Sequence, residues 1–431
     1  MKAREIFSSR ITTILTMVGV AVGLGNVWRF PYMMGQNGGS AFLVVYLVFV
    51  LVFAIPAITA EWSLGRFTRH GPIGAMERAF GPFGRWIGFL LVMTVLIANS
   101  YYVVIVGNVA FSAVFATFTG FTKASIPLYN ARLGNGYLQA GIALSVIGLA
   151  LWVVCRGIGK GIERVSKLFV PLFGIMIITL IIMALRLPGA TTALRAFLAP
   201  DFSQLTPTSV FAALGQAFFS LSLGGTFYLV YGSYLRDEES IPKAAIATGI
   251  GDAGAALLAS LFIVPTVLAL GLNMQAGPSL IFETLPAMFS AIPAGRVIGT
   301  AFLIGLWMMA FLSTVAAFQV IVAALTDSFN FSITQAALIV GSVEAILMLP
   351  SALNPEIIGT LDLIFGSGMQ MLGSALTIIA LFWGCDRVVA AKQIFGGRTE
   401  GIRGLYLLWL RWVVPATLGI MLVLYIIDSL D

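Results

Sequence analysis

The stretch MVGVAVGLGNVWRFP, residues 17–31, lies in an apolar run long enough to cross a bilayer, yet its composition opposes a continuous helix. It holds Gly19, Gly23 and Gly25, and it ends with a full charge at Arg29. Glycine in a helix interior costs about 1 kcal/mol relative to alanine, and an arginine at the centre of a membrane helix costs about 2.5 kcal/mol or more. We therefore interpret this stretch as a broken helix whose freed backbone groups serve a binding site.

The composition places the whole chain in a membrane. Its 431 residues are 59% hydrophobic and only 10% charged, whereas a soluble domain has about 25% charged residues. Apolar runs of about 20 residues predict an all-α integral membrane protein, with residues 1–431 forming a single domain. The eleven predicted spans cover residues 11–36, 41–65, 86–117, 137–154, 162–185, 208–235, 241–271, 294–325, 333–350, 357–384 and 405–428.

The net charge of +6 reflects topology rather than nucleic-acid binding. With the N-terminus inside, 17 of the Lys and Arg residues fall in cytoplasmic segments and 5 in external ones. This asymmetry follows the positive-inside rule. We expect a multi-pass protein of the inner (plasma) membrane with a cytoplasmic N-terminus and, because the span count is odd, an external C-terminus. The first run lacks a small-residue cleavage site and is interpreted as a retained span, not a signal peptide.

Cysteine and histidine are too scarce for several kinds of chemistry. Cys155 and Cys385 lie at predicted cytoplasmic span ends, where free thiols are expected, and His70 is the only histidine. A histidine metal site, a histidine proton relay and a nucleophile–base pair with His or Cys are therefore excluded, and we do not expect an enzyme.

A second break lies in the sixth span, GQAFFSLSLGGTFYLVYGSYLR, residues 215–236. Ser220, Ser222, Gly224, Gly225 and Thr226 interrupt it at mid-depth. The first and sixth spans open two consecutive sets of five, and interrupted segments in matching places indicate a transporter site at the bilayer midplane. Such glycines also serve as helix-packing positions, but two interrupted spans in register favour the site. Freed carbonyls suit sodium, and half-helix N-termini suit an anionic group.

Several motifs resemble the neurotransmitter:sodium symporter family over essentially the whole chain. They are AVGLGNVWRFP in the first span, AEWSLGR in the second, GIGKGIERVSK before the fifth, GQAFFSLSLGG in the sixth and LPAMFS in an external loop. The length of the chain, with eleven predicted spans, resembles that of the bacterial eleven-helix branch of the family. The resemblance implies two inverted five-helix repeats, residues 11–185 and 208–384, a peripheral helix at 405–428, and alternating access.

The resemblance also implies two sodium sites. The first would use Ala21, Asn26 and Ser220, completed by a substrate carboxylate, with Asp252 as a further candidate ligand because Gly251 stands where an asparagine is often found. The second would use Gly19, Val22, Met309 and Ser313. Leu312 stands where a threonine ligand is common, so this site has either lost one oxygen or moved it to Thr314. One or two sodium ions are expected.

The remaining charges in the spans are assigned gating and structural roles by the resemblance. The outer gate would join Arg29 to Asp362 through water, with Gln216 helping to hold the arginine. The inner gate would join Arg4 to Asp327, supported by Ser233 and Tyr234. Glu61, too costly to leave unpaired in the second span, should accept hydrogen bonds from the unwound sixth span. Asp252 resembles the carboxylate that replaces chloride in some relatives, so chloride should not be required.

Gly23 distinguishes between substrates. Monoamine carriers of the family have an aspartate at this position, whereas glycine leaves room for the substrate's own carboxylate beside sodium. We expect a zwitterionic amino acid with a large hydrophobic or aromatic side chain, because Ala98, Gly225 and Ala317 are small. Thr226, Asn99 and Ser100 could add polar contacts. The candidate substrate residues are Val20, Ala21, Gly23, Leu24, Gly25, Ala98, Tyr102, Phe219, Ser220, Ser222, Gly225, Ser313 and Ala317.

Sodium-coupled symport into the cell is thus the leading hypothesis, with the amino acid, sodium and the lipid bilayer as partners and no obligate protein partner evident. A substrate-gated channel is one alternative, although Arg29, Asp362 and the Tyr102–Phe219 pair would plug a pore. A substrate-sensing receptor that has lost transport is another, and it is motivated by the weakened second sodium site.

Overall fold

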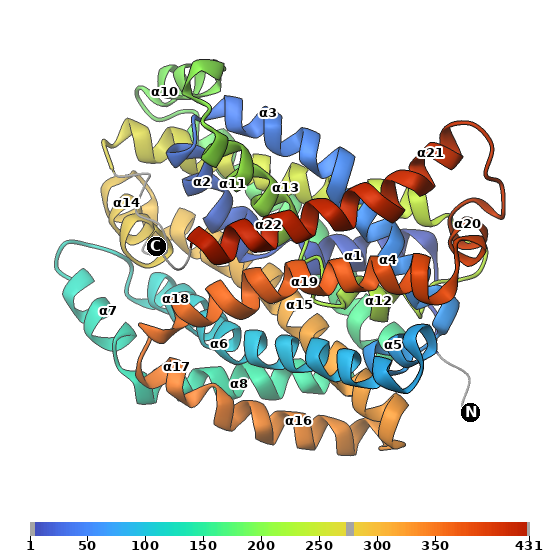
Figure 1. Ribbon diagram of the computed structural model, residues 1–431. Coiled ribbons are helices and arrows are strands. Elements are labelled where there is room, and N and C mark those ends of the chain that lie inside the picture. The colour runs from blue at the N-terminus through green and yellow to red at the C-terminus, as the bar shows by residue number, and fades with distance from the viewer. Residues whose placement is uncertain (1–4, 273–279, 429–431) are drawn as a thin grey trace.

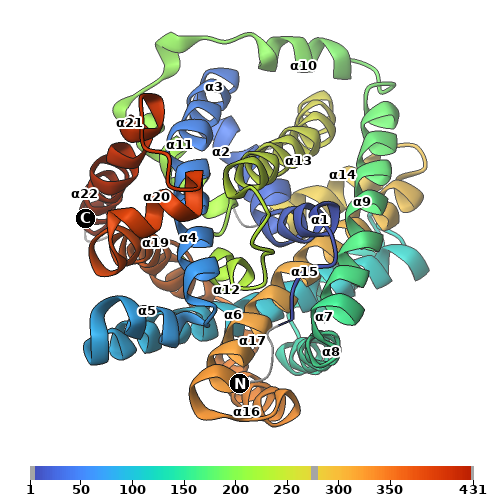
Figure 2. The same cartoon turned by 90° about the vertical axis from the view of Figure 1, so that its right-hand side faces the viewer.

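The structure is a computed structural model that describes residues 5–272 and 280–428, and within them every regular element is a helix. The helices form one bundle (Figure 1). Short helices α7 (Ile126–Leu133), α10 (Ala190–Leu198) and α14 (Leu285–Ala291) gather at one end, called here the α14 end. Helices α5 (Pro72–Phe80) and α20 (Arg387–Phe395) lie at the other end, called the α20 end (Figures 1 and 2).

Nine helical segments in the described chain are long and apolar enough to cross a membrane, in agreement with the corresponding predicted spans. These segments are Ser40–Thr68, Pro72–Phe118, Gly136–Cys155, Ile158–Ala184, Ile241–Ala269, Gly295–Phe329, Ile333–Leu353, Ile357–Cys385 and Ile402–Tyr425. Counting the bent pair Arg10–Ala21 and Gly25–Gln36 as one more span gives ten. The sixth predicted span is divided into α11 (Pro207–Ser220) and α12 (Phe227–Gly232), each too short to cross alone.

Several of these segments contain π-helical turns that hydropathy does not reveal. The second described span joins α3 (Ser40–Phe49) to α4 (Ile55–Thr68) through the π-helical segment η2 (Val50–Ala54). The segment Ile357–Cys385 is made of α18 (Ile357–Leu361), η7 (Asp362–Gly368), α19 (Met369–Ile379) and η8 (Ala380–Cys385). π-Turns in α-helices occur frequently at functional sites, and η7 begins at one of the predicted gate residues.

The core of the bundle is built around α15 (Gly295–Phe329). In its most apolar window 89% of the residues are buried, against 28% in the last segment, Ile402–Tyr425. Helix α15 packs along α6 (Gly84–Phe118) and also contacts α1 (Arg10–Ala21) and α9 (Glu163–Ala184). The last segment continues into α22 (Val414–Asp428), which packs mainly on α19 at the edge of the bundle (Figure 2).

Two glycines bring the backbones of α4 and α12 into direct contact. A Cβ on Gly65 would lie 1.9 Å from the Leu229 carbonyl oxygen, and a Cβ on Gly232 would lie 2.7 Å from the Trp62 carbonyl oxygen. No side chain fits at either position without moving backbone. The inner half of the sixth predicted span is therefore tightly packed against α4.

Candidate functional site

The first break separates α1 from η1 (Gly25–Arg29), and the two halves meet at an angle of 56°. Val22 is extended, with φ −71° and ψ 118°. The Gly23 amide donates to Asn26 Oδ1 over 2.9 Å, so a side chain replaces one lost helical hydrogen bond. Gly23 itself has little free space, because a Cβ there would lie 3.0 Å from Ser313 Oγ and 3.3 Å from the Tyr102 hydroxyl.

The second break spans residues 221–226 between α11 and α12. Ser222, Gly224 and Thr226 have φ of 52°, 81° and 56°, values that force the chain out of a helical path. The Gly224 amide donates to the fully buried Glu61 over 2.9 Å. A Cβ on Gly224 would lie 1.6 Å from the Gln370 carbonyl oxygen, so the unwound segment lies directly on the backbone of α19.

A buried polar cluster joins the two breaks. The Asn26 amide donates to Ser220 Oγ over 3.0 Å and to Asp252 Oδ1 over 2.6 Å. Ser220 Oγ donates to Asp252 Oδ2 over 2.8 Å, and the Tyr46 hydroxyl donates to the same oxygen over 3.4 Å. Asp252, on α13 (Ile241–Ala269), is completely buried. Its carboxylate is thus solvated by three donors from three other helical segments, and Tyr46 is a member that the sequence did not indicate.

A cavity of about 740 Å³ lies beside this cluster. It is lined by eleven of the thirteen candidate substrate residues, namely Ala21, Gly23, Leu24, Gly25, Ala98, Tyr102, Phe219, Ser220, Ser222, Ser313 and Ala317. The other two, Val20 and Gly225, are not among the lining residues. The Val20 carbonyl accepts from Ser313 Oγ over 3.1 Å, and the Phe227 ring covers Gly225, with Cε2 2.3 Å from where a Cβ would stand.

Phe227 and Thr94 line the same cavity and were absent from the candidate substrate set, and so does Asn99, which the sequence suggested as a polar contact, whereas Thr226 and Ser100 are not among the lining residues. The space expected at Gly225 is taken by Phe227 from the first turn of α12. Thr94 and Asn99 follow from the position of Ala98 on α6, because residues three or four apart on a helix share a face and Asn99 adjoins Ala98. That helical spacing was the available signal for Thr94.

The predicted ligands of the second sodium site lie around a side chain that supplies no oxygen. A Cβ on Gly19 would lie 2.8 Å from Leu312 Cδ1, so the leucine packs directly against this part of α1. The Thr314 hydroxyl donates to the Ala310 carbonyl of its own helix over 3.3 Å, and Met309 is fully buried. Ser313 is the hydroxyl of this group that reaches the cavity.

The predicted outer gate is not joined by a direct contact. The Arg29 guanidinium lies 3.9 Å above the Phe219 ring centroid, and Asp362 accepts from the Tyr101 hydroxyl over 2.9 Å. Among the described residues no ion pair links Arg29 to Asp362. Among the described residues, neither Nε2 nor Oε1 of the buried Gln216 has a hydrogen-bond partner. The cavity continues past Asp362 to exposed residues Asn130 and Glu283, so it reaches the surface at the α14 end.

The α20 end of the pathway is closed by polar contacts. Gln319 Nε2 donates to the Tyr234 hydroxyl over 2.7 Å, and the Gly71 amide donates to Asp327 Oδ2 over 2.7 Å. Asp327 and Tyr234 make further interactions as well. Arg4, the predicted partner of Asp327, lies outside the described residues. The Ser233 carbonyl accepts from Arg69 Nη1 over 3.0 Å.

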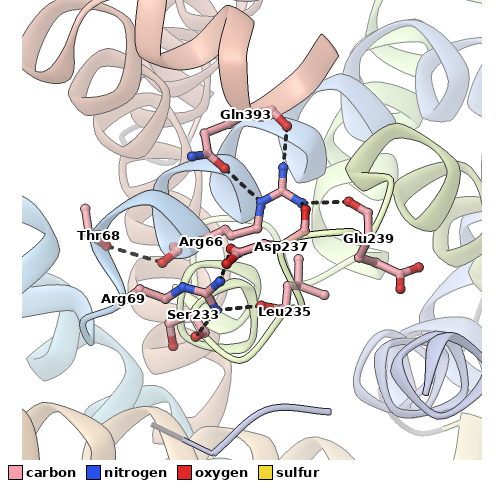
Figure 3. Close-up of polar contacts among 9 residues, drawn as sticks. Arg66, Thr68, Arg69, Ser233, Leu235, Asp237, Glu239 and Gln393 are labelled. Atoms are coloured by element: carbon pink, nitrogen blue, oxygen red, sulfur yellow. Dashed lines mark hydrogen bonds and ion pairs between the residues drawn. The ribbon is translucent and has the colours of Figure 1, made fainter. Parts of the chain in front are cut away.

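Arg66 of α4 and Arg69, which directly follows the end of α4, extend this closure (Figure 3). Arg66 donates through Nε to Gln393 Oε1 over 2.7 Å and through Nη1 to the Glu239 carbonyl over 2.6 Å. Arg69 donates to the Leu235 carbonyl over 2.5 Å and pairs with Asp237, whose carboxylate is exposed. These contacts connect α4 with α20 and with the loop that follows α12.

Comparison with known proteins gives a consistent identification. Residues 4–127 and 130–372 match the model of the sodium:neurotransmitter symporter family. An uncharacterized sodium-dependent transporter of Haemophilus influenzae is 33% identical over 76% of this chain and 75% of its own length. An uncharacterized sodium-dependent transporter of Methanocaldococcus jannaschii is 32% identical over 88% of this chain and 82% of its own.

A solved structure resembles the whole molecule. It is the crystal structure of MhsT in complex with L-phenylalanine, which has 34% sequence identity and a TM-score of 0.88 and covers 98% of this chain and 99% of that one. The fold, the two breaks and the matched sequence all point to one family. This chain belongs to the sodium:neurotransmitter symporter family.

Proposed function

We propose that this protein carries a zwitterionic amino acid with a large, aromatic side chain into the cell together with sodium. The observation that carries the proposal is the meeting of both helix breaks at one cavity, joined by the cluster of Asn26, Ser220 and Asp252. Unpaired backbone groups are tolerated at membrane depth where they line such a cavity. Family membership supports sodium coupling.

The first sodium ion and the substrate carboxylate would bind at the first break. Ala21 and Gly23 line the cavity at the point where α1 ends. No further turn of α1 follows there, so backbone groups of this break face the cavity instead. The Ala21 carbonyl, Asn26 and Ser220 supply neutral oxygens of the kind that sodium prefers in transporters. A Cβ at Gly23 would already crowd Ser313 Oγ and the Tyr102 hydroxyl, so a residue without a side chain is needed here if the carboxylate is to bind beside the ion.

The side chain of the substrate would extend towards α6 and α15, where Ala98 and Ala317 line the cavity. Both residues are small, so this part of the wall leaves space for a bulky side chain. MhsT, the similar protein, is solved with L-phenylalanine. An aromatic side chain is therefore the proposed class, with Phe227 on one wall.

We further propose eleven crossings, in which α11 and α12 together make the sixth, and two inverted sets of five followed by a peripheral helix. The positive-inside rule puts the α20 end in the cytoplasm and the α14 end outside. The cavity then opens outward past Arg29 and Asp362. The contacts of Gln319 with Tyr234, and those of Arg66 and Arg69, close the inner end. This is the arrangement required to admit substrate from outside in an alternating-access cycle.

The ion requirements follow from two positions. Asp252 provides a fixed negative charge beside the first sodium site, so external chloride is not needed to balance the ion. Leu312 occupies space against Gly19 where an oxygen would be needed, so the second sodium site binds weakly or stays empty.

Uptake into proteoliposomes tests the proposal. An inward sodium gradient should drive accumulation of a labelled aromatic amino acid, selected from a panel of all common amino acids, in both chloride and gluconate. Potassium in place of sodium is the control for the gradient. Binding without accumulation would indicate a receptor, and current far in excess of substrate flux would indicate a channel.

A further inference from the structure

An arginine lies within the last apolar segment, Ile402–Tyr425, away from the cavity of the proposed transport site. Arg411 belongs to the π-helical segment η9 (Trp409–Val413), which joins α21 (Ile402–Leu408) to α22. A charged side chain within a membrane-spanning segment is costly, and it usually marks a function with a definable partner. The partner of Arg411 is therefore informative about what this segment binds.

The described part of the protein supplies aromatic rings to Arg411 but no acceptor. Its Cζ atom lies 4.5 Å from the centroid of the Trp383 ring and 5.6 Å from that of the Trp412 ring. No ion pair joins Arg411 to a described residue, and its buried Nε has no hydrogen-bond partner among them. A buried donor without an acceptor is unfavourable, which indicates that the acceptor comes from outside the chain.

Trp383 and Trp412 form an aromatic corner beside this guanidinium, where α19 and α22 run together at the edge of the bundle (Figure 2). Their rings meet edge to face, with centroids 4.6 Å apart and planes at 87°. The two residues are 47% and 54% exposed. Trp409 of the same π-helical segment instead donates Nε1 to the Val52 carbonyl over 2.8 Å. Arginine and tryptophan side chains carry donors and no acceptor, so the exposed corner suits an anion.

The corner lies at the depth of a lipid headgroup. Trp383 stands two residues before Cys385, the end of its apolar segment, and α20 follows directly. A Cβ on the adjacent Gly384 would lie 2.7 Å from the Ala79 carbonyl oxygen of α5. Helices α5 and α20 mark the α20 end, which the proposed topology puts in the cytoplasm. Because tryptophan is enriched at membrane–water interfaces, we place the corner at the headgroups of the inner leaflet.

The charged groups around the corner favour a headgroup with net negative charge. Arg387 begins α20, and Arg78 lies on α5, which contacts η8. Of the acidic residues on these elements, Glu77 pairs with Arg85, and Asp386 accepts from the first turn of α20. The ammonium group of a zwitterionic headgroup would meet arginines here, whereas a phosphodiester without that group would not.

We propose that Arg411, Trp383 and Trp412 form a binding site for an anionic phospholipid of the inner leaflet. The planar guanidinium presents its donors as a fork that fits two phosphate oxygens at once, and the indole rings pack against the glycerol part of the lipid. Basic groups between membrane helices on the cytoplasmic side bind such headgroups. The inference goes beyond the proposed function, because it depends on the membrane and not on the substrate.

Native mass spectrometry of the detergent-solubilised protein measures the binding directly. Phosphatidylglycerol or phosphatidylcholine with the same acyl chains is titrated in, and the fraction of protein with one bound lipid gives an apparent affinity for each. We expect the wild type to bind phosphatidylglycerol about fivefold or more tightly than phosphatidylcholine. Inorganic phosphate and glycerol 3-phosphate at the same concentration as the lipid should not displace it, because they lack the acyl chains.

Three variants assign the preference to the corner. Arg411→Gln removes the charge and the fork, and should bring the two affinities close together. Arg411→Lys keeps the charge as a point donor and should retain part of the preference. Arg156→Gln is the matched control and should bind like the wild type. Arg156 follows α8 (Gly136–Cys155) and lies 3.8 Å above the Trp152 ring, but it is exposed and has one ring beside it.

A further variant, Trp412→Leu, leaves the arginine in place and removes one ring, so it should lower the preference without removing a charge. If Arg411→Gln does not yield folded protein, Arg411→Lys and Trp412→Leu decide the matter, and an unchanged preference in both overturns the inference.

The remaining outcomes are equally decisive. Equal affinity of the wild type for the two lipids, or a preference that survives Arg411→Gln, overturns the inference. An equal loss in Arg156→Gln would show a general effect of cationic charge and would also overturn it, as would displacement of the lipid by the soluble phosphates. Failure of sodium-driven uptake would remove the proposed function and leave this inference standing, because lipid binding is measured without transport.

Discussion

Asn26 and Asp252 form a direct contact between the first and seventh predicted spans, with Nδ2 donating to Oδ1 over 2.6 Å. The Asn26 amide oxygen at the same time accepts from the Gly23 amide. One side chain therefore holds the unwound backbone on one side and a buried carboxylate on the other. Substitutions at either residue should therefore affect the ion dependence of transport more strongly than the stability of the fold.

Asp252→Ser should make transport sensitive to chloride. The fixed negative charge is lost, and a bound anion can replace it, so uptake should fall severely in gluconate and recover in part in chloride. Uptake by the wild type should be equal in the two anions. A strict chloride requirement in the wild type would contradict the role given to Asp252.

Asn26→Ala should weaken sodium-dependent substrate binding by at least about tenfold, which corresponds to about 1.4 kcal/mol. It removes an oxygen ligand and also leaves Asp252 with one donor fewer. The measurement is the sodium concentration for half-maximal binding of a radiolabelled amino acid. Asn37→Ala is the control, because Asn37 Nδ2 donates to the nearby Met33 carbonyl away from the cluster. Unchanged sodium affinity in Asn26→Ala would place the ion elsewhere.

Gly23→Asp should abolish amino-acid binding, with an affinity loss of about 100-fold or more, or about 2.7 kcal/mol. The new carboxylate would occupy the place of the substrate carboxylate and repel it. Gly23→Ala separates size from charge, because a Cβ alone would lie 3.0 Å from Ser313 Oγ and requires only a small shift. Normal binding in Gly23→Asp would show that the substrate carboxylate lies in another place.

Leu312→Thr should strengthen the dependence on sodium. The wild type has an apolar side chain packed against Gly19, so we expect a sodium Hill coefficient for substrate binding close to one. Threonine would add an oxygen and raise sodium affinity several-fold, and it should slow release of substrate to the inside. Leu312→Val is the control of similar shape. No change in sodium affinity would indicate that Thr314 or another residue already supplies the ligand.

Arg69→Gln should destabilise the closed inner end much more than Asp237→Asn. Arg69 donates to the carbonyls of Ser233 and Leu235, and hydrogen bonds from a charged donor are worth about 1.5–3 kcal/mol. The Asp237 carboxylate is 90% exposed, and an exposed ion pair contributes about 0–1 kcal/mol. The difference is measured by heating each variant in detergent and recording the temperature at which substrate binding is lost. A larger effect for Asp237→Asn would show that the ion pair is the main contact.

The sequence was sufficient to locate the spans and the breaks because both depend on local composition. The run of Ser220, Ser222, Gly224, Gly225 and Thr226 predicts an unwound segment wherever it lies, and the structure has one at residues 221–226. Hydropathy likewise places Ser40–Thr68 and Gly295–Phe329 to within a few residues of the predicted spans. The π-turn at η2 has no such signature, since its residues are as apolar as those of the flanking helices.

The composition of the cavity wall was harder to predict because it depends on packing between distant segments. Phe227 fills the space beside Gly225 through a backbone turn at Thr226, whose positive φ hydropathy does not indicate. The hydrogen bond between Asn99 and Glu344 depends on the contact of α6 with α16 (Ile333–Leu347). Tyr46 approaches Asp252 from the second span. The Asn99–Glu344 and Tyr46–Asp252 contacts require the relative positions of two helices, which one sequence does not contain, whereas the Phe227 contact depends on a local turn.

The glycine contacts that lock α12 onto α4 decide where this protein can bend. Because Gly65 and Gly232 bring the two backbones together, we expect α12 and α4 to move as one rigid body, a lever whose hinge is the unwound segment 221–226. A helix advances about 1.5 Å per residue, so the Tyr234 closure lies roughly 10 Å along the lever from that hinge. Rotation displaces the far end of a lever most and its axis least. In the proposed alternating-access cycle, the residues proposed to bind the substrate would therefore lie near the axis of rotation and move little, while the contacts that close the ends of the pathway would move most.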